Sequence, residues 1–273
     1  MFGRERPDQF KQQISKSFDA TRRKYGVQGS FHWEFARRLV ERAPLQSGQA
    51  VMDVATGTAP AAIMAAQIVG TEGYVIGIDI SSGMLKLARL SLAEVGLENI
   101  HLIRGDAEQL MFPNQRFNGV LCSSAIVWFP DIPRALREWH RVLKLGGWIA
   151  FSCFGGPARE TINNLVLDLL KSYNILYPEL NEPLNTPEKC RRMVEEAGFT
   201  RVTVHTDQNT QFTTDPEASF RQAWASVSRF NIDLDSSQIA QIREQYIAQF
   251  TRLTPRQDIW NHDYEQFVIA YVE

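Results

Sequence analysis

Cysteine is scarce in this sequence, and the three cysteines present show no pairing. Cys122, Cys153 and Cys190 are widely spaced, with no Cys-x-x-Cys motif and no set of histidine ligands nearby. This spacing is not typical of a zinc site or of a disulfide framework, so no bound metal is expected. Because Cys122 and Cys153 lie in apolar, strand-like runs, we interpret them as buried structural thiols.

Long apolar runs and an excess of one charge are also missing. No run reaches the roughly 18 residues that a membrane-spanning helix needs, and the first residues lack the apolar core of a signal peptide. We therefore expect a cytoplasmic location without stable membrane insertion. The chain has 29 Lys and Arg against 31 Asp and Glu. Since nucleic-acid surfaces usually need a basic excess, no nucleic-acid partner is expected.

An alternation of short apolar runs with amphipathic segments begins at residue 49. We expect strands at 50–55, 74–80, 100–104, 117–123 and 148–153, and helices at 60–69, 83–95 and 132–143. This alternation is typical of a parallel α/β sheet with helices on both faces. The nearly continuous apolar strands agree with a sheet that is covered on both sides. A length of 273 residues fits one large domain of this kind.

Two helical regions flank this sheet. Residues 1–45 are expected to form an N-terminal helical cap with two helices, the second beginning near Ser30. Residues 46–273 form the main domain, with a helical lid insertion at about 207–260. The C-terminal elements expected are helices at 158–177, 186–196 and within 215–253, and strands at 200–205 and 266–272. Extra core packing is the alternative interpretation of the aromatic residues in the insertion.

The stretch Asp53-Val54-Ala55-Thr56-Gly57-Thr58 has the form of a ligand-binding turn. A buried strand runs into a glycine turn, and a helix follows with Pro60 at its first position. Asp79 closes the next strand, where a carboxylate can hydrogen-bond both hydroxyls of a ribose. A dinucleotide site needs further glycines to admit a pyrophosphate, and Asp53 would repel that group. The pattern therefore disfavours an NAD-dependent dehydrogenase and favours a ligand with a cationic amino group.

The motifs of this region, taken in order, resemble those of class I S-adenosylmethionine-dependent methyltransferases. The resemblance rests on residues 53–58, 77–85, 105–113, 117–123 and 141–147. The nearest group is the ubiquinone and menaquinone biosynthesis C-methyltransferases with the related small-molecule enzymes. The resemblance implies a Rossmann-like, doubly wound sheet, mostly parallel with an antiparallel last strand. It also implies S-adenosylmethionine as the cofactor.

The resemblance implies a role for each cofactor-facing position. Four residues would surround the methionine part of the cofactor: Asp53, Ala55, Gly57 and Thr58. The adenosine part would contact Asp79 at the ribose, Ile80 and Met84 on the adenine, and Asp106 with Ala107 at the adenine amino group. Ser123 and Ser124 would lie near the sulfonium. The sequence departs from the family pattern at Ala59, Asn118 and Leu145, and only Ala59 belongs to a cofactor loop, which it would narrow.

Methyl transfer from a sulfonium is an in-line displacement, so the protein mainly orients the reactants and excludes water. A general base is needed only where the acceptor is poorly ionised. The candidates are His32, His140, His205 and His262. We assign His32 first as the catalytic residue, because its helix should cap the site. A structural role is the alternative for each of them.

The expected acceptor is a small molecule. Some methyltransferases that act on amino groups or nucleic-acid bases carry a polar Asn/Asp-Pro-Pro-aromatic motif after the fourth strand, whereas this chain has Trp128 and Phe129 there. This favours methylation of an oxygen or carbon of a lipophilic or aromatic metabolite, such as a quinone precursor. The substrate-binding residues predicted are Trp33, Trp128, Phe129, Phe220 and Trp224. The alternative is a cofactor-binding protein that transfers no methyl group or catalyses another reaction. The sequence leaves the oligomeric state open.

Overall fold

A computed structural model describes residues 7–21, 30–155, 162–175, 177, 180–212, 215–228, 230, 234–253 and 260–273. Within these residues one sheet holds its strands in the order β3-β2-β1-β4-β5-β7-β6. The strands are β1 Ala50–Val54, β2 Tyr74–Asp79, β3 Ile100–Arg104, β4 Phe117–Cys122, β5 Leu143–Gly155, β6 Thr200–Phe212 and β7 Trp260–Tyr271.

Strands β1 to β5 pair in parallel, whereas β7 runs antiparallel to both of its neighbours, β5 and β6. The predicted α/β fold, a doubly wound and mostly parallel sheet with an antiparallel last strand, is confirmed. From β1 the chain continues to β2 and β3 on one side, and then crosses to β4 on the other side of β1. The carboxyl ends of β1 and β4 therefore form the switch point at which open α/β sheets bind ligands.

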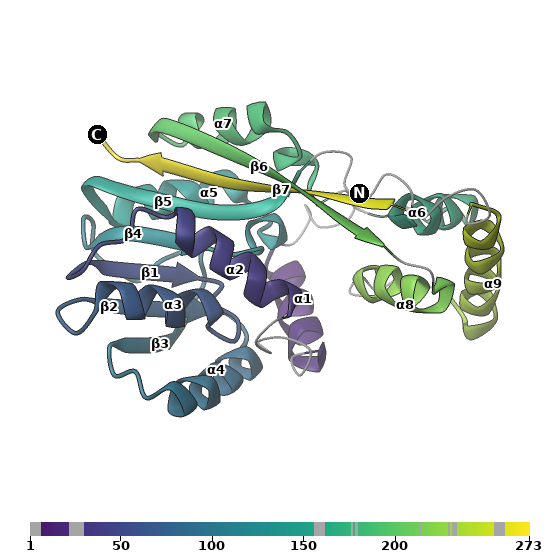
Figure 1. Ribbon diagram of the computed structural model, residues 1–273, viewed down its shortest axis with the longest axis horizontal. Helices are drawn as coiled ribbons and strands as arrows, with labels where there is room; N and C mark the ends of the chain where they lie inside the picture. The colour runs from purple at the N-terminus through teal and green to yellow at the C-terminus, as the bar shows by residue number, and fades with distance from the viewer. Residues whose placement is uncertain are drawn as a thin grey trace.

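Helices α2 and α3 cover one face of this sheet, and α5 and α7 cover the other (Figure 1). The helices are α1 Pro7–Thr21, α2 Phe31–Arg42, α3 Pro60–Val69, α4 Ser82–Val95, α5 Ile132–Val142, α6 Ile162–Ser172, α7 Pro187–Glu196, α8 Pro216–Val227 and α9 Ser236–Leu253. The Ser30 hydroxyl accepts the Trp33 N–H, so α2 begins with the side-chain cap that the sequence predicts.

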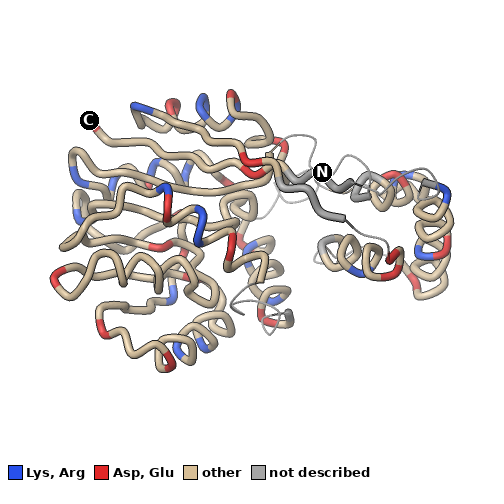
Figure 2. The backbone as a smooth tube through the Cα atoms, in the orientation of Figure 1, with Lys and Arg blue, Asp and Glu red and all other residues tan. Residues whose placement is uncertain are grey.

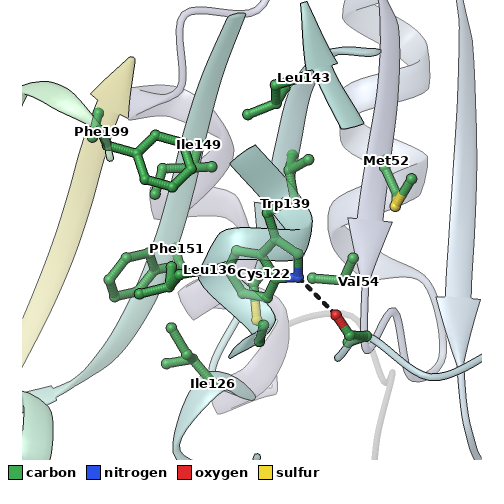
Figure 3. Close-up of a cluster of buried hydrophobic side chains, with 14 of the residues drawn as sticks. Met52, Val54, Cys122, Ile126, Leu136, Trp139, Leu143, Ile149, Phe151 and Phe199 are labelled. Atoms are coloured by element: carbon green, nitrogen blue, oxygen red, sulfur yellow. Dashed lines mark hydrogen bonds between the residues drawn. The ribbon is translucent and has the colours of Figure 1, made fainter. Parts of the chain in front are cut away.

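Buried side chains fill both spaces between the sheet and its helices. On one face Trp139 of α5 is fully buried among residues that include Leu136, Ile149 and Phe151 (Figure 3). Its indole N–H donates to the carbonyl of Ala107 at 3.1 Å. This hydrogen bond joins α5 to the segment after β3, so core packing also fixes the position of the third predicted cofactor motif.

Helices α6, α8 and α9 form a second packing unit, which we call the helical lobe. Their buried side chains, among them Leu170, Phe220 and Tyr246, contact one another in a cluster of their own. Strands β6 and β7 run on from the main sheet toward the lobe (Figure 1). The predicted insertion at about 207–260 contained α8 and α9 only. The structure adds α6, which precedes β6, because its apolar side chains pack on the other two helices.

The strands that lead to the lobe are longer than predicted. Strand β6 extends to Phe212 and β7 begins at Trp260, whereas we expected strands only at 200–205 and 266–272. In the added part of the two strands, polar residues lie opposite each other, for example Thr206 and Gln266. The sequence there lacks the apolar alternation that predicts a strand, because backbone hydrogen bonds, which no side-chain pattern reveals, hold this part of the strands together.

All three cysteines are free and buried, which includes Cys122 and Cys153, the two for which we predicted burial. Basic and acidic residues are interspersed along the backbone (Figure 2), for example on α2, where Arg37 pairs with both Glu34 and Glu41. Among the described residues, no helix combines the length and the apolar character needed to cross a bilayer. The same residues contain no group of three or more His, Cys, Asp and Glu side chains that could hold a metal ion.

Candidate active site

The loop after β1 turns sharply at the carboxyl edge of the sheet. Ala55, Gly57 and Ala59 all have positive φ angles, of 52°, 59° and 69°. Left-handed backbone costs a residue with a side chain about 1–2 kcal/mol, and such strain gathers at functional sites. A Cβ atom on Gly57 would meet nothing within 4 Å. Open space therefore lies over the turn, where a ligand can approach the backbone.

Asp53 is a buried acid directly below this turn. Its side chain is 1% exposed, and its carboxylate accepts the hydroxyl of Thr56 at 2.6 Å. Burial raises the pKa of Asp53 from 3.8 to about 7, and the charge of Asp79 contributes to the rise. A cation placed beside the carboxylate would lower this pKa again. The loop is therefore suited to a cationic ligand and unsuited to a phosphate.

Asp79 joins the loops that follow β1 and β2. One of its carboxylate oxygens accepts the backbone N–H of Gly57 and the other accepts that of Ser81, each at 2.8 Å. Burial also raises the pKa of this carboxyl group. Each oxygen of an ionised carboxylate can accept a second hydrogen bond. Asp79 can thus hold its loops and bind ligand hydroxyls together.

Asp106, after β3, has partners from two parts of the chain. Its carboxylate accepts the N–H of Glu108 at 2.9 Å and the ammonium of Lys11, from α1, at 2.7 Å. Lys11 also pairs with the carboxylate of Glu108. Burial alone would lower the pKa of Lys11, but its bonds with Asp106 and Glu108 outweigh burial and raise it. Lys11 therefore stays charged at the edge of the site.

The remaining predicted cofactor residues lie at the same edge of the sheet. Thr58 follows the glycine turn, Met84 lies in the first turn of α4 and Ala107 follows β3, and all three are buried. Ile80 directly follows β2 and is half-buried. Their positions agree with the roles that the resemblance implies, and those roles stay predictions.

The segment after β4 holds a buried hydroxyl without a partner. Ser123 and Ser124 follow β4 directly, and Ser124 has a positive φ of 55°. The Ser124 N–H donates to the hydroxyl of Ser152 at 3.1 Å. Its own Oγ is buried and has no hydrogen-bond partner in the described structure. Unsatisfied buried polar atoms are uncommon in native structures, so this hydroxyl marks a position where a ligand atom can bind.

Four aromatic residues from distant parts of the chain meet beside this segment, and we call them the aromatic cluster. The ring centroid of Trp128 lies 5.5 Å from that of Phe18, on α1, and 6.3 Å from that of Phe230. Tyr177 packs edge-on against Phe230 at 5.0 Å. The cluster supplies an apolar, aromatic surface only a few residues after Ser124.

Three predicted substrate-binding residues have other neighbours. Phe129 packs edge-on against Trp139, whose ring is fully buried in the core. Phe220 is 5% exposed and stacks on Trp224 inside the helical lobe. These rings are engaged in packing, so we do not carry Phe129 and Phe220 forward as acceptor contacts. Trp224 is half-buried at the edge of the lobe, and its predicted role stays a prediction.

The predicted base and its neighbour lie in the first turn of α2. His32 is half-buried and packs edge-on against Phe31 at 5.4 Å, and Phe31 stacks on Phe154 near the end of β5. His32 thus lies near the carboxyl end of β5, which pairs with β4. Trp33 follows it and is also half-buried. The catalytic role of His32 and the substrate role of Trp33 stay predictions.

Two of the other histidine candidates lie away from these loops. His140 of α5 packs on Phe199, and His205 is exposed on β6. The side chain of His262 is outside the described residues.

The contacts of α1 with the site were missed by sequence reasoning. Lys11, Phe18 and Asp19 are separated from their partners by 60 or more residues of chain. The sequence signal is only that α1 is amphipathic. Nothing in local spacing indicates which surface its polar face contacts.

Parts of this sequence are similar to those of known proteins. Residues 51–147 match the family model described as a methyltransferase domain. The chain is 37% identical over 139 residues to the demethylmenaquinone methyltransferase of Listeria monocytogenes serotype 4a (strain HCC23), covering 51% of this chain and 58% of that one. It is 37% identical over 144 residues to the aklanonic acid methyltransferase DauC of Streptomyces sp. (strain C5), covering 52% and 66%. The chain thus spans less than two thirds of either relative.

A similar fold occurs among solved structures. A candidate methyltransferase from Bacillus halodurans C-125 superposes with a TM-score of 0.61 at 21% identity, covering 87% of this chain and 98% of that one. At this identity the likeness concerns the fold alone. Together with the family match at residues 51–147, which runs from β1 to the start of β5, it supports a methyltransferase domain in this part of the chain.

Proposed function

We propose that this chain binds S-adenosylmethionine at the loops after β1, β2 and β3 and transfers its methyl group to a small acceptor. The observation that carries the proposal is the pair of buried carboxylates, Asp53 and Asp79, at a glycine turn with open space above it. A pyrophosphate would be repelled there. A ligand with a ribose, a sulfonium and an amino group satisfies both carboxylates.

Different residues of the site contact different parts of the cofactor. Asp79 binds the ribose hydroxyls, and the carboxylate of Asp106 accepts a hydrogen bond from the adenine amino group. Asp53 favours the cationic methionine end, which passes over Gly57. The open space at Gly57 and the unsatisfied hydroxyl of Ser124 both fit a ligand in this position.

S-adenosylmethionine, when bound, supplies a methyl group attached to a sulfonium, and its leaving group, a neutral thioether, needs no proton. The protein therefore has to align the acceptor and keep water out. The aromatic cluster around Trp128 holds a flat or lipophilic acceptor next to the segment that carries Ser124. Where the acceptor is a poorly ionised hydroxyl, His32 is the residue that we assign to take up its proton.

The acceptor class that we propose is a quinone precursor or a related aromatic metabolite, methylated at oxygen or carbon. The names of the two relatives, for demethylmenaquinone and aklanonic acid, support this class. The aromatic character of the surface around Trp128 supports it as well. The expected absence of a nucleic-acid partner and the cytoplasmic location stay predictions.

The test is turnover with a panel of quinols, naphthols and simple phenols. The protein is incubated with methyl-labelled S-adenosylmethionine, and the products are analysed by mass spectrometry. We expect S-adenosylhomocysteine and one labelled methyl group on at least one aromatic acceptor. Binding of the cofactor without transfer to any member of the panel would contradict the proposal, and it would favour a cofactor-binding protein that transfers no methyl group.

A further inference from the structure

Helix α1 directs one face toward the candidate active site. Lys11, Ile14 and Phe18 are spaced three and four residues apart, which places them on one side of a helix. Ile14 is buried, although the helix as a whole is polar. The helix lies next to α4 in the described structure. The face that carries Lys11 is therefore the face that contacts the main domain.

Lys11 anchors the first half of α1 at the predicted adenine position. Its ammonium bonds the carboxylate of Asp106 at 2.7 Å and pairs with that of Glu108, whose side chain is 2% exposed. The second carboxylate oxygen of Glu108 accepts the N–H of Asp131. Removal of the cation from a buried carboxylate strongly destabilises the folded protein. The contact with Lys11 is thus integral to the site.

Asp19 anchors the other end of α1 at the predicted ribose position. Its carboxylate accepts the hydroxyl of Ser81 and, at 3.0 Å, the N–H of Gly83. Ser81 is the residue whose own N–H bonds Asp79. A negative charge is also favourable at the N-terminus of a helix, here α4. Asp19 therefore holds the turn that positions Asp79.

Phe18 brings the same helix into contact with the aromatic cluster, where we expect the acceptor to bind. Its ring packs edge-on against Trp128 at 5.5 Å. Helix α1 thus contacts the predicted adenine, ribose and acceptor positions at Asp106, Ser81 and Trp128.

We propose that Lys11 and Asp19 are positioning residues of the cofactor site, which hold α1 as a wall across the adenosine part of the bound cofactor. Lys11 orients Asp106 toward the adenine amino group, and Asp19 orients the turn that follows Asp79. Release of the cofactor requires these contacts to open. The inference rests on the proposed function, because it takes the bound ligand to be an S-adenosyl compound.

The contacts of Lys11 are ion pairs, which makes this part of the inference testable by salt. The other α1 contacts are hydrogen bonds from neutral groups to Asp19 and the apolar packing of Ile14 and Phe18. Salt screens exposed charges over about 10 Å at 0.1 M ionic strength and buried pairs much less, so we expect the salt effect to come mainly from the pair of Lys11 with the more exposed Asp106. Higher salt should therefore speed the release of bound S-adenosylhomocysteine from the native protein.

The experiment measures the affinity and release rate of S-adenosylhomocysteine for the full chain and for Lys11→Met, Asp19→Ala and Lys16→Met. Lys16 is exposed on the same helix and serves as the matched control. We expect roughly tenfold or greater acceleration of release in Lys11→Met and Asp19→Ala, with no change in Lys16→Met. The acceleration by salt should largely disappear in Lys11→Met, which a loss of general stability would not cause.

Two further measurements guard against misfolding. The double variant Lys11→Met/Glu108→Gln leaves no unpaired buried charge and should show the same fast release. Hydrogen exchange of the α1 amides in the native protein should slow when S-adenosylhomocysteine binds. Native release rates and native salt dependence in all variants, with no change in exchange, would overturn the inference while leaving the proposed function intact. Absence of any binding by the native protein would overturn both.

Discussion

The carboxylate of Asp79 accepts the backbone N–H of Gly57 at 2.8 Å. This bond ties the glycine turn after β1 to the end of β2, and it brings the two main parts of the predicted cofactor site together. One residue therefore both shapes the loop and presents the carboxylate that we expect to bind the ribose.

Replacement of Asp79 by Ala should weaken the binding of S-adenosylhomocysteine by roughly 1.5–3 kcal/mol, the contribution of hydrogen bonds to a charged group. The melting temperature should fall as well, because the N–H groups of Gly57 and Ser81 lose their acceptor. Calorimetry and thermal unfolding measure the two effects. An unchanged affinity would place the ribose elsewhere.

Replacement of Gly57 by Ala tests the open space over the turn. The positive φ of 59° predicts a stability loss of about 1–2 kcal/mol, and the added methyl group would also enter the ligand space. Gly96, at the end of α4, has a φ of 66° and equally open surroundings. Gly96→Ala is thus the matched control, with a similar stability loss and native affinity. Equal affinities of the two variants for S-adenosylhomocysteine would argue against a ligand at Gly57.

The raised pKa of Asp53 predicts that cofactor affinity depends on pH. The carboxyl group is protonated in the free protein below its pKa of about 7, whereas a cationic ligand favours the ionised form. Affinity for S-adenosylmethionine should therefore rise with pH up to about 7 and level off above it, with up to about one proton released on binding below pH 7. Titrations at several pH values, with Asp53→Asn as the comparison, measure the slope. A slope that persists in Asp53→Asn would assign it to another group.

The same pKa has a consequence for folding. The pKa of Asp53 is higher in the folded state than the ordinary value of 3.8, so between these values the folded state binds more protons than the unfolded state. This group therefore makes stability decrease as the pH rises from about 4 to about 7. Urea unfolding of Asp53→Asn across this range should show a weaker decrease than the native protein. Parallel curves for the two proteins would contradict the assignment.

Trp128 should affect the acceptor rather than the cofactor. Its ring packs between Phe18 and Phe230, and Trp128→Leu removes that aromatic surface. On an acceptor identified by the turnover screen, we expect KM to rise roughly tenfold with native affinity for S-adenosylhomocysteine. Phe129→Leu, which alters a ring packed on the core, should leave KM unchanged. A higher KM in Phe129→Leu together with an unchanged KM in Trp128→Leu would place the acceptor next to Phe129 instead.

The sheet and its cofactor loops could be predicted from the sequence because their signals are local. Continuous apolar strands and the glycine turn at Gly57 define β1 to β5 and the position of Asp79. The contact between Lys11 and Asp106 spans 95 residues, and no spacing rule indicates it. The place of α6 in the lobe could not be predicted either, because amphipathic helices do not specify their partners. The contact of Phe129 with Trp139 could not be predicted, because aromatic character does not tell a core residue from a pocket residue.

Calorimetric titration of the native protein tests most directly whether the loops after β1, β2 and β3 bind an S-adenosyl cofactor. S-adenosylmethionine and S-adenosylhomocysteine should each bind at a single site, and NAD should produce no binding heat. Binding of NAD without binding of either S-adenosyl compound would contradict the account.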